Sequence, residues 1–339
     1  RPLGFMHLLG RALCGMQGTD DGLVAWLEVP RALAEQAGLS PSEVEGLVQY
    51  PRMVDGVEVA ILFKEVEPSR TRVSLRSQRY VDVSAIARRF GVPVEWIATG
   101  CGSDDVLDCA LRALGGPGRR LVFVPPTFSM VEFLALANGL EPVAVERSGG
   151  FPAAAALLAE RPDLVYLCRP ENPTGELLPR SVVEDLLAVR EGPVVLLDEA
   201  YAEFSGQTAI PLALEYPNVV VLRTFSKWAG LAGLRIGFGV FPRPIAAQIW
   251  KIKQPFNVNA AAVVALQATL EDIDTLRQAV QRILQEKQRL KRALEALPGV
   301  RVYPSAANFF LVELASGRAR AVRDALMERG IIVRYFDKP

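Results

Sequence analysis

The sequence predicts an α/β protein whose larger part is a mainly parallel sheet with helices on both faces. Short apolar runs without alternation are typical of buried parallel strands, and they occur at residues 121–124, 164–168, 193–199 and 218–224. Helical or loop stretches separate these runs, as crossover connections between parallel strands require. Ligands of such sheets bind beyond the carboxyl ends of the strands, so the residues that follow each run form the candidate site.

A smaller, unrelated α/β unit is expected in front of this sheet, over residues 1–91. Residues 22–29 predict a strand. The next segment predicts a helix that begins at Ser40, with Pro41 in its first turn and Glu43 closing a capping box.

A strand pair and a short helix follow in the same unit. Alternation predicts a strand over residues 57–66, with residues 70–77 as its antiparallel neighbour and a helix over residues 81–91. Four side chains are expected on the apolar face of the first of these strands: Val57, Val59, Ile61 and Phe63.

The sheet-bearing domain is expected over residues 92–260, followed by an incomplete α/β lobe over residues 261–339. Residues 271–299 carry apolar side chains at three- and four-residue spacing and therefore predict a long amphipathic helix that braces the structure. The apolar stripe consists of Leu276, Val280, Ile283, Leu290, Leu294 and Leu297.

Composition excludes several classes of protein. Half of the 339 residues are hydrophobic, which excludes a disordered chain, and 38 Lys plus Arg balance 38 Asp plus Glu. Zero net charge gives no field that would attract nucleic acid or an anionic membrane. No apolar stretch approaches the roughly 20 residues of a membrane span, so we expect a soluble, cytoplasmic protein.

Histidine and cysteine usage narrows the chemistry. The only histidine, His7, is expected in a surface helix, which excludes a Ser-His-Asp triad and polyhistidine metal sites. The cysteines lack CxxC spacing and fit a reduced cytosolic interior in which each thiol is buried. They are Cys14, Cys101, Cys109 and Cys168.

The first candidate segment, TGCGSDD, leads into a helix. Gly102, Ser103 and Asp104 would offer free backbone amides and a hydroxyl group to a phosphate, although a serine before acidic residues is also the pattern of a plain helix cap. The next strand is followed by Phe128, whose ordinary role would be in the core.

Two further strands lead to candidate polar side chains. Asn172, in the turn NPTG, offers an amide after the strand over residues 164–168. Asp198 ends a wholly apolar strand, with Tyr201 three residues later, and a buried acid needs a partner. That partner is either a helix N-terminus or a cationic ring nitrogen.

The last strand leads into TFSKWAGLAGLRIG, which holds one lysine and one arginine among small and apolar residues. Lys227, shielded at a strand end, is a candidate amine for Schiff-base chemistry. Arg235 is flanked by glycine and leucine and is suited to a phosphate that approaches the backbone. In order at successive strand ends, these features point to one site.

The segments GSDD, PPTF, NPTG, DEAY and SKWAGLAGLRIG together resemble the signature of fold-type I pyridoxal-phosphate aminotransferases. Within that group they resemble the histidinol-phosphate aminotransferase branch, which YPNVVVLRTFSKWAGLAGLRIGFGV, KQPFNVN and GIIVR also fit. The resemblance covers residues 92–339 and implies pyridoxal 5′-phosphate as the cofactor.

The resemblance implies roles for the strand-end residues. Lys227 would hold the cofactor as a Schiff base and move the substrate proton, while Asp198 would pair with the pyridine nitrogen. Tyr201 and Asn172 would bond the phenolic oxygen, and Phe128 would stack on the ring. The phosphate group would be held by Gly102, Ser103, Asp104, Thr224, Ser226 and Arg235.

The implied reaction moves an amino group between L-histidinol phosphate and 2-oxoglutarate, so the partners are a phosphorylated amine and a 2-oxo acid. Arg334 would contact the substrate phosphate, and Asn172 would also contact the substrate. Family members are homodimers. The alternative is a decarboxylase of a phosphorylated amino acid that uses the same lysine and aspartate.

Residues 1–91 resemble another family, the nucleotide-binding C-terminal domain of DHH-type phosphoesterases that degrade very short RNAs, mainly through RVSLRSQRYVDVSAIARRFG. Arg72, Arg76 and Arg79 would then touch phosphates, or would form a solvated basic edge. A non-catalytic nucleotide-binding module is therefore a third interpretation. The metal-binding half of that family is absent, so nuclease activity is not expected.

Both resemblances are incomplete, as in a fusion of two partial genes joined near residues 90–92. We expect no N-terminal arm and no tyrosine that reaches a neighbouring subunit's phosphate, because Tyr50 lies in the other resemblance. A second substrate-binding arginine would lie beyond Pro339. Loss of these contacts would impair turnover more than cofactor binding.

Overall fold

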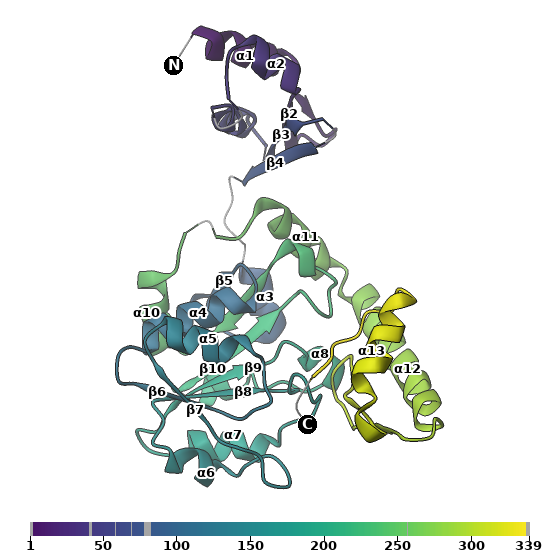
Figure 1. Ribbon diagram of the computed structural model, residues 1–339. Helices are drawn as coiled ribbons and strands as arrows, with labels where there is room; N and C mark the ends of the chain where they lie inside the picture. The colour runs from purple at the N-terminus through teal and green to yellow at the C-terminus, as the bar shows by residue number, and fades with distance from the viewer. Residues whose placement is uncertain are drawn as a thin grey trace.

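A computed structural model describes residues 3–40, 43–57, 59–68, 70–77, 83–255 and 257–336, with the side chains of residues 75–77 and 316 outside that description. The described residues form an N-terminal unit and a larger body, each with its own hydrophobic core (Figure 1). Within these ranges, no helix has both the length and the apolar character needed to cross a membrane.

The N-terminal unit is a four-stranded sheet of order β1-β2-β3-β4, with β2 and β3 parallel and the outer pairs antiparallel. Its strands are β1 (Gln17–Gly18), β2 (Val24–Val29), β3 (Val59–Glu67) and β4 (Arg70–Ser77). Its helices are α1 (Leu3–Cys14), α2 (Arg31–Gln36) and the 3₁₀ helices η1 (Glu45–Gln49) and η2 (Pro51–Met53). The predicted strands and the antiparallel pairing of β3 with β4 are confirmed, and His7 is exposed on α1 as predicted.

The predicted capping box forms, but the α-helix after it does not. Glu43 Oε2 accepts from the backbone amide of Ser40 at 2.8 Å and from its hydroxyl at 2.7 Å. The following segment winds into η1, a 3₁₀ helix that begins at Glu45. Pro41 lies outside the described residues.

The predicted apolar face of β3 is wrong in its second half. Ile61 and Phe63 are half-buried, whereas Leu62 and Lys64 on the opposite face are fully buried. The reason is tertiary, since η1 packs on that face and supplies Glu45, whose carboxylate accepts from Lys64 Nζ at 2.6 Å. A buried lysine paired in this way is tolerated where an unpaired one would not be.

The larger body contains a seven-stranded sheet of order β5-β11-β10-β9-β8-β6-β7. All neighbours pair in parallel except β11, which is antiparallel to both β5 and β10. The strands are β5 (Ile97–Gly100), β6 (Arg120–Phe123), β7 (Glu141–Ala144), β8 (Leu164–Cys168), β9 (Val194–Asp198), β10 (Val219–Thr224) and β11 (Gly237–Val240). The four runs predicted to be parallel strands are β6, β8, β9 and β10.

Helices cover both faces of this sheet, and side-chain alternation separates two cores. Val195, Leu197 and Val221 face one core, while Leu196 and Leu222 face the other. The first core lies against α3 (Val83–Phe90), α6 (Ala154–Ala159), α7 (Arg180–Leu187), α8 (Ala202–Ser205), α9 (Leu212–Glu215) and α11 (Ala260–Glu271). The second lies against α4 (Ser103–Leu114), α5 (Met130–Ala137) and α10 (Arg243–Ile252). The short 3₁₀ helices of this body are η3 (Val94–Trp96) and η4 (Ala232–Leu234).

The helix α3 belongs by packing to the larger body, although it was expected within the N-terminal unit. Its Ile86 and Ala87 are buried in the first core of the large sheet, and its Phe90 ring lies 5.4 Å from that of Phe238 on β11. The N-terminal unit contacts the larger body where β4 meets α11.

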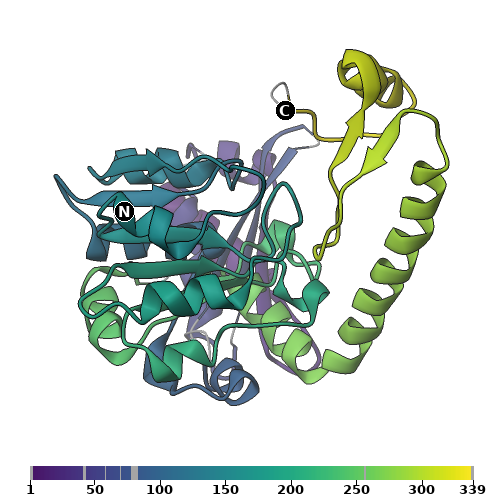
Figure 2. The ribbon, with the colours of Figure 1, turned by 90° about the horizontal axis from the view of Figure 1, so that it is seen from below.

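The C-terminal lobe consists of the long helix α12 (Ile273–Glu295), the hairpin β12 (Val300–Val302) and β13 (Val312–Leu314), the turn η5 (Ala315–Gly317) and α13 (Ala319–Glu328). Figure 2 shows α12 running along one side of the body, with the hairpin and α13 beyond its end. The long helix is confirmed, but half of its predicted stripe is wrong. Ile283, Leu290 and Leu297 are exposed, whereas Leu276 and Val280 pack on the large core.

Candidate active site

The candidate residues gather where the parallel strands end. Cys168 of β8 and Leu222 of β10 both lie in register with Asp198, the last residue of β9. Parallel strands bring their carboxyl ends to one edge of a sheet, so the segments that follow β8, β9 and β10 are neighbours there. The prediction that these segments form one site is consistent with this topology.

Asp198 is buried and already holds two donors. Its Oδ2 accepts from the hydroxyl of Tyr166 at 2.8 Å, and its Oδ1 accepts from the amide of Ala200 at 2.9 Å. Burial raises its pKa to about 6, the two hydrogen bonds oppose that shift, and the charges of Asp104 and Lys227 act on it as well. A cationic partner would stabilise the ionised form of this buried carboxyl group.

Tyr166 was missed from the sequence. It lies inside the apolar strand β8, where burial and the charge of Asp198 raise its pKa well above the ordinary value. The available signal was chemical, since a tyrosine within a fully buried strand needs a partner for its hydroxyl group.

The N-terminus of α4 is the segment predicted to bind a phosphate group. Gly102 precedes the helix with φ +90°, and neither Ser103 nor any other side chain caps it, so the alternative of a plain serine cap is wrong. Gly237 of β11 lies against this turn so closely that an added Cβ would come within 2.4 Å of the Ser103 amide nitrogen. Glycine is therefore required for the backbones to approach one another.

Arg235 reaches the same turn from the segment after β10. Its Nη2 lies 2.9 Å from Asp104 Oδ2, and a Cβ on Gly102 would lie 2.5 Å from that nitrogen. Nearby, the Ser226 amide donates to Thr224 Oγ1 at 3.1 Å, and the two hydroxyl groups lie 2.9 Å apart. Hydroxyl, amide and guanidinium donors thus converge on one end of α4.

Lys227 lies in the bend after β10 and is exposed. Its Nζ lies 5.6 Å from the ring centroid of Tyr201, the residue that precedes α8. Tyr201 is buried, which raises the pKa of its hydroxyl group, and its ring meets that of Phe309 edge to face at 5.0 Å. Phe309, from the C-terminal lobe, was also missed, because only the tertiary fold brings it here.

The loops after β6 and β8 are tied together by another buried acid. Glu171 accepts from the Thr127 hydroxyl at 2.7 Å and from the Asn172 amide at 3.0 Å, and burial raises its pKa to about 8. Phe128 lies beside Thr127 and packs on the second core. Among the described residues, the side-chain amide of Asn172 has no hydrogen-bond partner, so it is free to bind a ligand.

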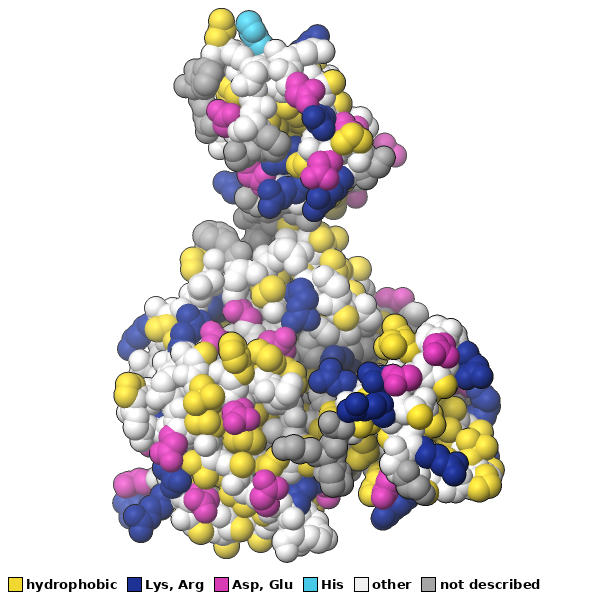
Figure 3. Space-filling model, viewed as in Figure 1, with side chains coloured by type: hydrophobic (Ala, Val, Ile, Leu, Met, Phe, Trp, Pro, Cys, Tyr) yellow, Lys and Arg dark blue, Asp and Glu magenta, His cyan; other side chains and the backbone are white. Residues whose placement is uncertain are grey.

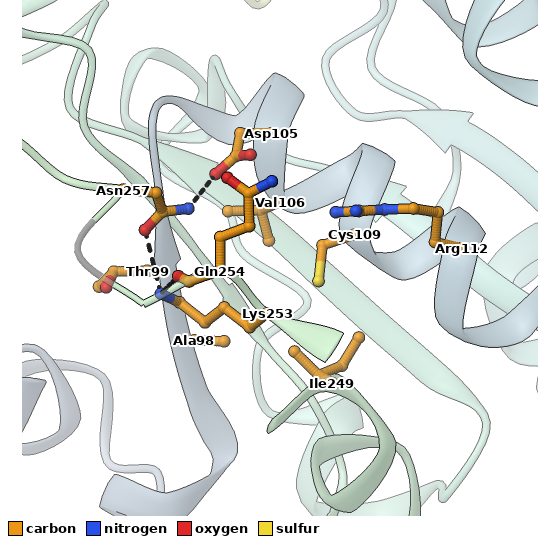
Figure 4. A pocket seen from close by; sticks show the side chains of 10 residues that line it. All are labelled: Ala98, Thr99, Asp105, Val106, Cys109, Arg112, Ile249, Lys253, Gln254 and Asn257. Atoms are coloured by element: carbon orange, nitrogen blue, oxygen red, sulfur yellow. Dashed lines mark hydrogen bonds between the residues drawn. The ribbon is translucent and has the colours of Figure 1, made fainter. Parts of the chain in front are cut away.

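A second network holds the turn before α4 from behind (Figure 4). Asp105 Oδ2 accepts from the Cys101 amide at 2.9 Å and from Asn257 Nδ2 at 2.6 Å, and Lys253 Nζ donates to Asn257 Oδ1 at 3.1 Å. Asp105 and Asn257 therefore position the turn. Sequence reasoning missed both, although an acid in the first turn of a helix is a recognisable signal.

The prediction that all four cysteine thiols are buried is wrong for two of them. Cys109 and Cys168 are buried, but Cys14 and Cys101 are exposed, because one ends a surface helix and the other lies in the turn before α4. Arg334 lies exposed after α13, where its guanidinium faces the ring of Phe336 at 5.8 Å. Within the described ranges it makes no hydrogen bond or ion pair with the strand-end residues.

Comparison with known proteins places the chain in a family. The family described as Aminotransferase class I and II matches residues 82–339. A histidinol-phosphate aminotransferase of Roseiflexus castenholzii is 44% identical over 319 residues, covering 91% of this chain and 79% of that protein. The chain belongs to the histidinol-phosphate aminotransferase family.

Solved structures of an aminotransferase and of a decarboxylase share the fold. The histidinol-phosphate aminotransferase of Sinorhizobium meliloti, in complex with pyridoxal-5′-phosphate, matches with 33% identity and a TM-score of 0.69, covering 74% of this chain and 71% of that one. The L-threonine-O-3-phosphate decarboxylase of Porphyromonas gingivalis matches with 25% identity and a TM-score of 0.66, covering 74% and 77%.

The N-terminal unit is not separated from the family by these comparisons. The match to the Roseiflexus protein covers more of the chain than residues 92–339 contain, so it extends into residues 1–91. Nothing in the comparisons supports the resemblance of this unit to DHH-type phosphoesterases. Of the arginines named for that role, Arg72 is exposed on β4, and the side chains of Arg76 and Arg79 lie outside the described residues. Figure 3 shows Lys and Arg side chains gathered at the base of the N-terminal unit.

Proposed function

We propose that this protein transfers an amino group between L-histidinol phosphate and 2-oxoglutarate with pyridoxal 5′-phosphate as its cofactor. The observation that carries the proposal is the buried carboxyl group of Asp198, close enough to Lys227 for the lysine charge to act on its pKa. Both residues lie at the carboxyl edge of a parallel sheet, which is where such sheets bind ligands.

The residues present fit that cofactor. A pyridinium nitrogen would give Asp198 the cation that its buried environment lacks, and the free amide of Asn172 would suit the phenolic oxygen. Backbone amides at the start of α4, the hydroxyl groups of Thr224 and Ser226, and the guanidinium of Arg235 suit the phosphate group. Arg235 would exchange its exposed ion pair with Asp104 for that phosphate.

Pyridoxal phosphate, when bound, supplies an electron sink for the bond broken at the substrate α-carbon. The chain supplies the proton transfer: the Lys227 amine, exposed beside the Tyr201 ring, would take the proton from that carbon and return it. Asp198 would keep the ring nitrogen protonated. We propose Phe128 for stacking on the ring, and Arg334 with Asn172 for the substrate.

Covalent attachment tests the proposal. After loading with pyridoxal phosphate and borohydride reduction, peptide mass spectrometry should find the cofactor on Lys227 alone. Lys227→Ala should lose the visible absorbance and the label, whereas Lys251→Ala, which removes an exposed lysine that donates to Gln248, should keep both. A label elsewhere in the wild-type chain would contradict the assignment.

A product assay separates the two reactions of this cofactor. With histidinol phosphate and 2-oxoglutarate, transfer yields glutamate. Release of carbon dioxide from a phosphorylated amino acid, without glutamate, would favour the decarboxylase alternative, which the likeness to the Porphyromonas gingivalis structure supports.

We further propose three parts: an N-terminal unit, a cofactor-binding domain that begins with α3 and continues to about residue 260, and a C-terminal lobe. The packing of Ile86 and Ala87 in the large core supports placing α3 with the cofactor-binding domain. A homodimer, a cytoplasmic location and the fusion of two partial genes stay predictions, and mass measurement in solution tests the first.

A further inference from the structure

A cavity of about 320 Å³ lies on the face of the large sheet that carries the first core. Its walls come from α3, α8, the loop after α8, the end of β10 with the bend that follows it, and the first half of α12. Alternation along β10 separates this cavity from Thr224 of the candidate active site. Thr224 shares a face with Leu222 of the second core, whereas Arg223, which lines the cavity, shares a face with Val221 of the first.

One of the three arginines that line this cavity has both terminal nitrogens paired within the protein. Arg223 is buried, its Nη1 donates to Glu199 at 2.9 Å, and its Nη2 donates to Glu203. Two carboxylates therefore bind this one guanidinium, and it lines the cavity without being a free binding group.

The other two arginines leave donors available. Arg277 on α12 pairs with Asp274 one turn away, at 2.9 Å and in an exposed position, so the pair contributes little binding energy. Arg89 on α3 makes no hydrogen bond or ion pair with any residue in the described ranges. The two guanidinium groups thus line one cavity, with no carboxylate of the described chain bonded to both.

Aromatic rings orient the unpaired Arg89. Its Cζ lies 5.4 Å from the ring centroid of Phe90 and 5.7 Å from that of Trp228. Such contacts hold a guanidinium without using its terminal N–H donors. Burial, followed by the charge of Arg277, lowers the pKa of Arg89, and the charge of Glu203 opposes that shift.

We propose that this cavity binds a small organic carboxylate with an aromatic or apolar body. The carboxylate would lie between Arg89 and Arg277, since the guanidinium fork matches its two oxygens. The body would lie against Phe90, Trp228 and Val280, which line the same cavity. The volume is at the lower end of ligand pockets, and the carboxylate of Glu203 on the wall favours a monoanion over a dianion.

The test uses the full, cofactor-loaded chain and two matched probes, benzoate and its neutral analogue benzamide. Binding is followed by calorimetry and by tryptophan fluorescence, because Trp228 is in the wall. We expect benzoate to bind without changing the visible absorbance of the cofactor. Benzamide should bind at least about tenfold more weakly, since a charge-assisted pair is lost.

Three methionine variants locate the site. Arg277→Met and Arg89→Met should each weaken benzoate binding about tenfold or more. Arg289→Met is the control, because Arg289 lies on the same helix and pairs with exposed Glu286 one turn away, at 2.7 Å, as Arg277 does with Asp274. Arg277 is exposed, so Arg277→Met decides the question even where Arg89→Met fails to fold.

Other outcomes overturn the proposal. Equal benzoate affinity in Arg277→Met and the control would place binding elsewhere, as would a changed cofactor absorbance. Equal binding of benzoate and benzamide would remove the role of charge. Inorganic phosphate that displaces benzoate with higher affinity would make the site one for simple anions instead.

Discussion

At the scale of single residues, the chemistry rests on an acid that the fold keeps from water. Asp198 is predictable as a candidate because it ends an apolar strand, yet its pKa depends on neighbours that only the fold supplies. The Tyr166 hydroxyl and the Ala200 amide oppose the effect of burial without cancelling it. A cationic ligand is the partner that would complete this environment.

Replacing Asp198 tests its ionisation in the cofactor-free chain. Its folded pKa of about 6 lies above the ordinary 3.8, so the folded state holds this proton more tightly than the unfolded chain does. The resulting stability is complete below about pH 4 and is lost as the pH rises through about 6, by roughly 3 kcal/mol. Asp198→Asn should lack this loss, and urea unfolding at about pH 4 and about pH 7 measures it.

Other carboxyl groups titrate in the same range, so the informative quantity is the difference in unfolding free energy between the wild type and Asp198→Asn. Burial also raises the pKa of Glu171, but this residue is present in both proteins, so its contribution to the pH dependence cancels. A difference that stays constant between the two pH values would show that Asp198 ionises as in water. Loading with cofactor should shrink the wild-type loss, because the ring cation favours the carboxylate.

At the scale of elements, a lysine from the long helix holds the segment that reaches the candidate site. Lys287 on α12 is buried, and its Nζ donates to the carbonyl oxygens of Ser305 and Ala307. The segment so held places Phe309 on Tyr201, and the Ala306 amide donates to Gly175 O in the NPTG turn at 2.7 Å. α12 thereby connects the lobe to the site.

Lys287→Met should loosen this segment. Methionine keeps an unbranched stem but leaves two carbonyl groups without their donor, which costs about 2–3 kcal/mol of unfolding free energy. Amide exchange at Ala306 and Ala307 should quicken. Lys291→Met is the control, because Lys291 lies one turn along the same helix and pairs with Glu295 at 3.6 Å. It should change the unfolding free energy and the exchange rates little. A similar effect in both variants would argue against a specific role of Lys287 in holding this segment.

The positions of helices and strands along the chain were the most predictable feature. Which side of each helix or strand is buried was the least predictable. The parallel strands could be read from apolar runs because a strand buried on both faces requires them. The inward face of β3 and the exposed positions of α12 could not, since each depends on which helix or lobe lies opposite. Leu62 and Ile283 illustrate this, the first buried and the second exposed against expectation.

At the scale of the whole molecule, the N-terminal unit has a core of its own. Its buried residues include Leu27 and Leu62 and none of the residues that form the cores of the large sheet. Separate cores allow separate unfolding, because few packed contacts cross between the two bodies.

A substitution that opens a cavity in the core of the N-terminal unit should therefore destabilise that unit alone. Leu27→Ala should destabilise the N-terminal unit by about 2–5 kcal/mol and speed amide exchange in β2 and β3. Amide exchange in β8 to β10 and the cofactor absorbance should stay unchanged. Leu197→Ala in the large core should instead speed exchange in β8 to β10 and change the cofactor absorbance, and leave exchange in β2 and β3 unchanged. Exchange that quickens throughout the chain in both variants would mean that the two bodies unfold as one.

The sequence by itself determined the parallel sheet, the order of the candidate residues along it and their likeness to a family, because apolar runs and short motifs are local properties. Only the tertiary structure decided the surroundings of those residues: the hydroxyl of Tyr166 on Asp198, the ring of Phe309 on Tyr201, and the unpaired Arg89 beside Arg277. These contacts join segments far apart in the chain. Burial, which sets the pKa of Asp198, exists only once those segments have packed together.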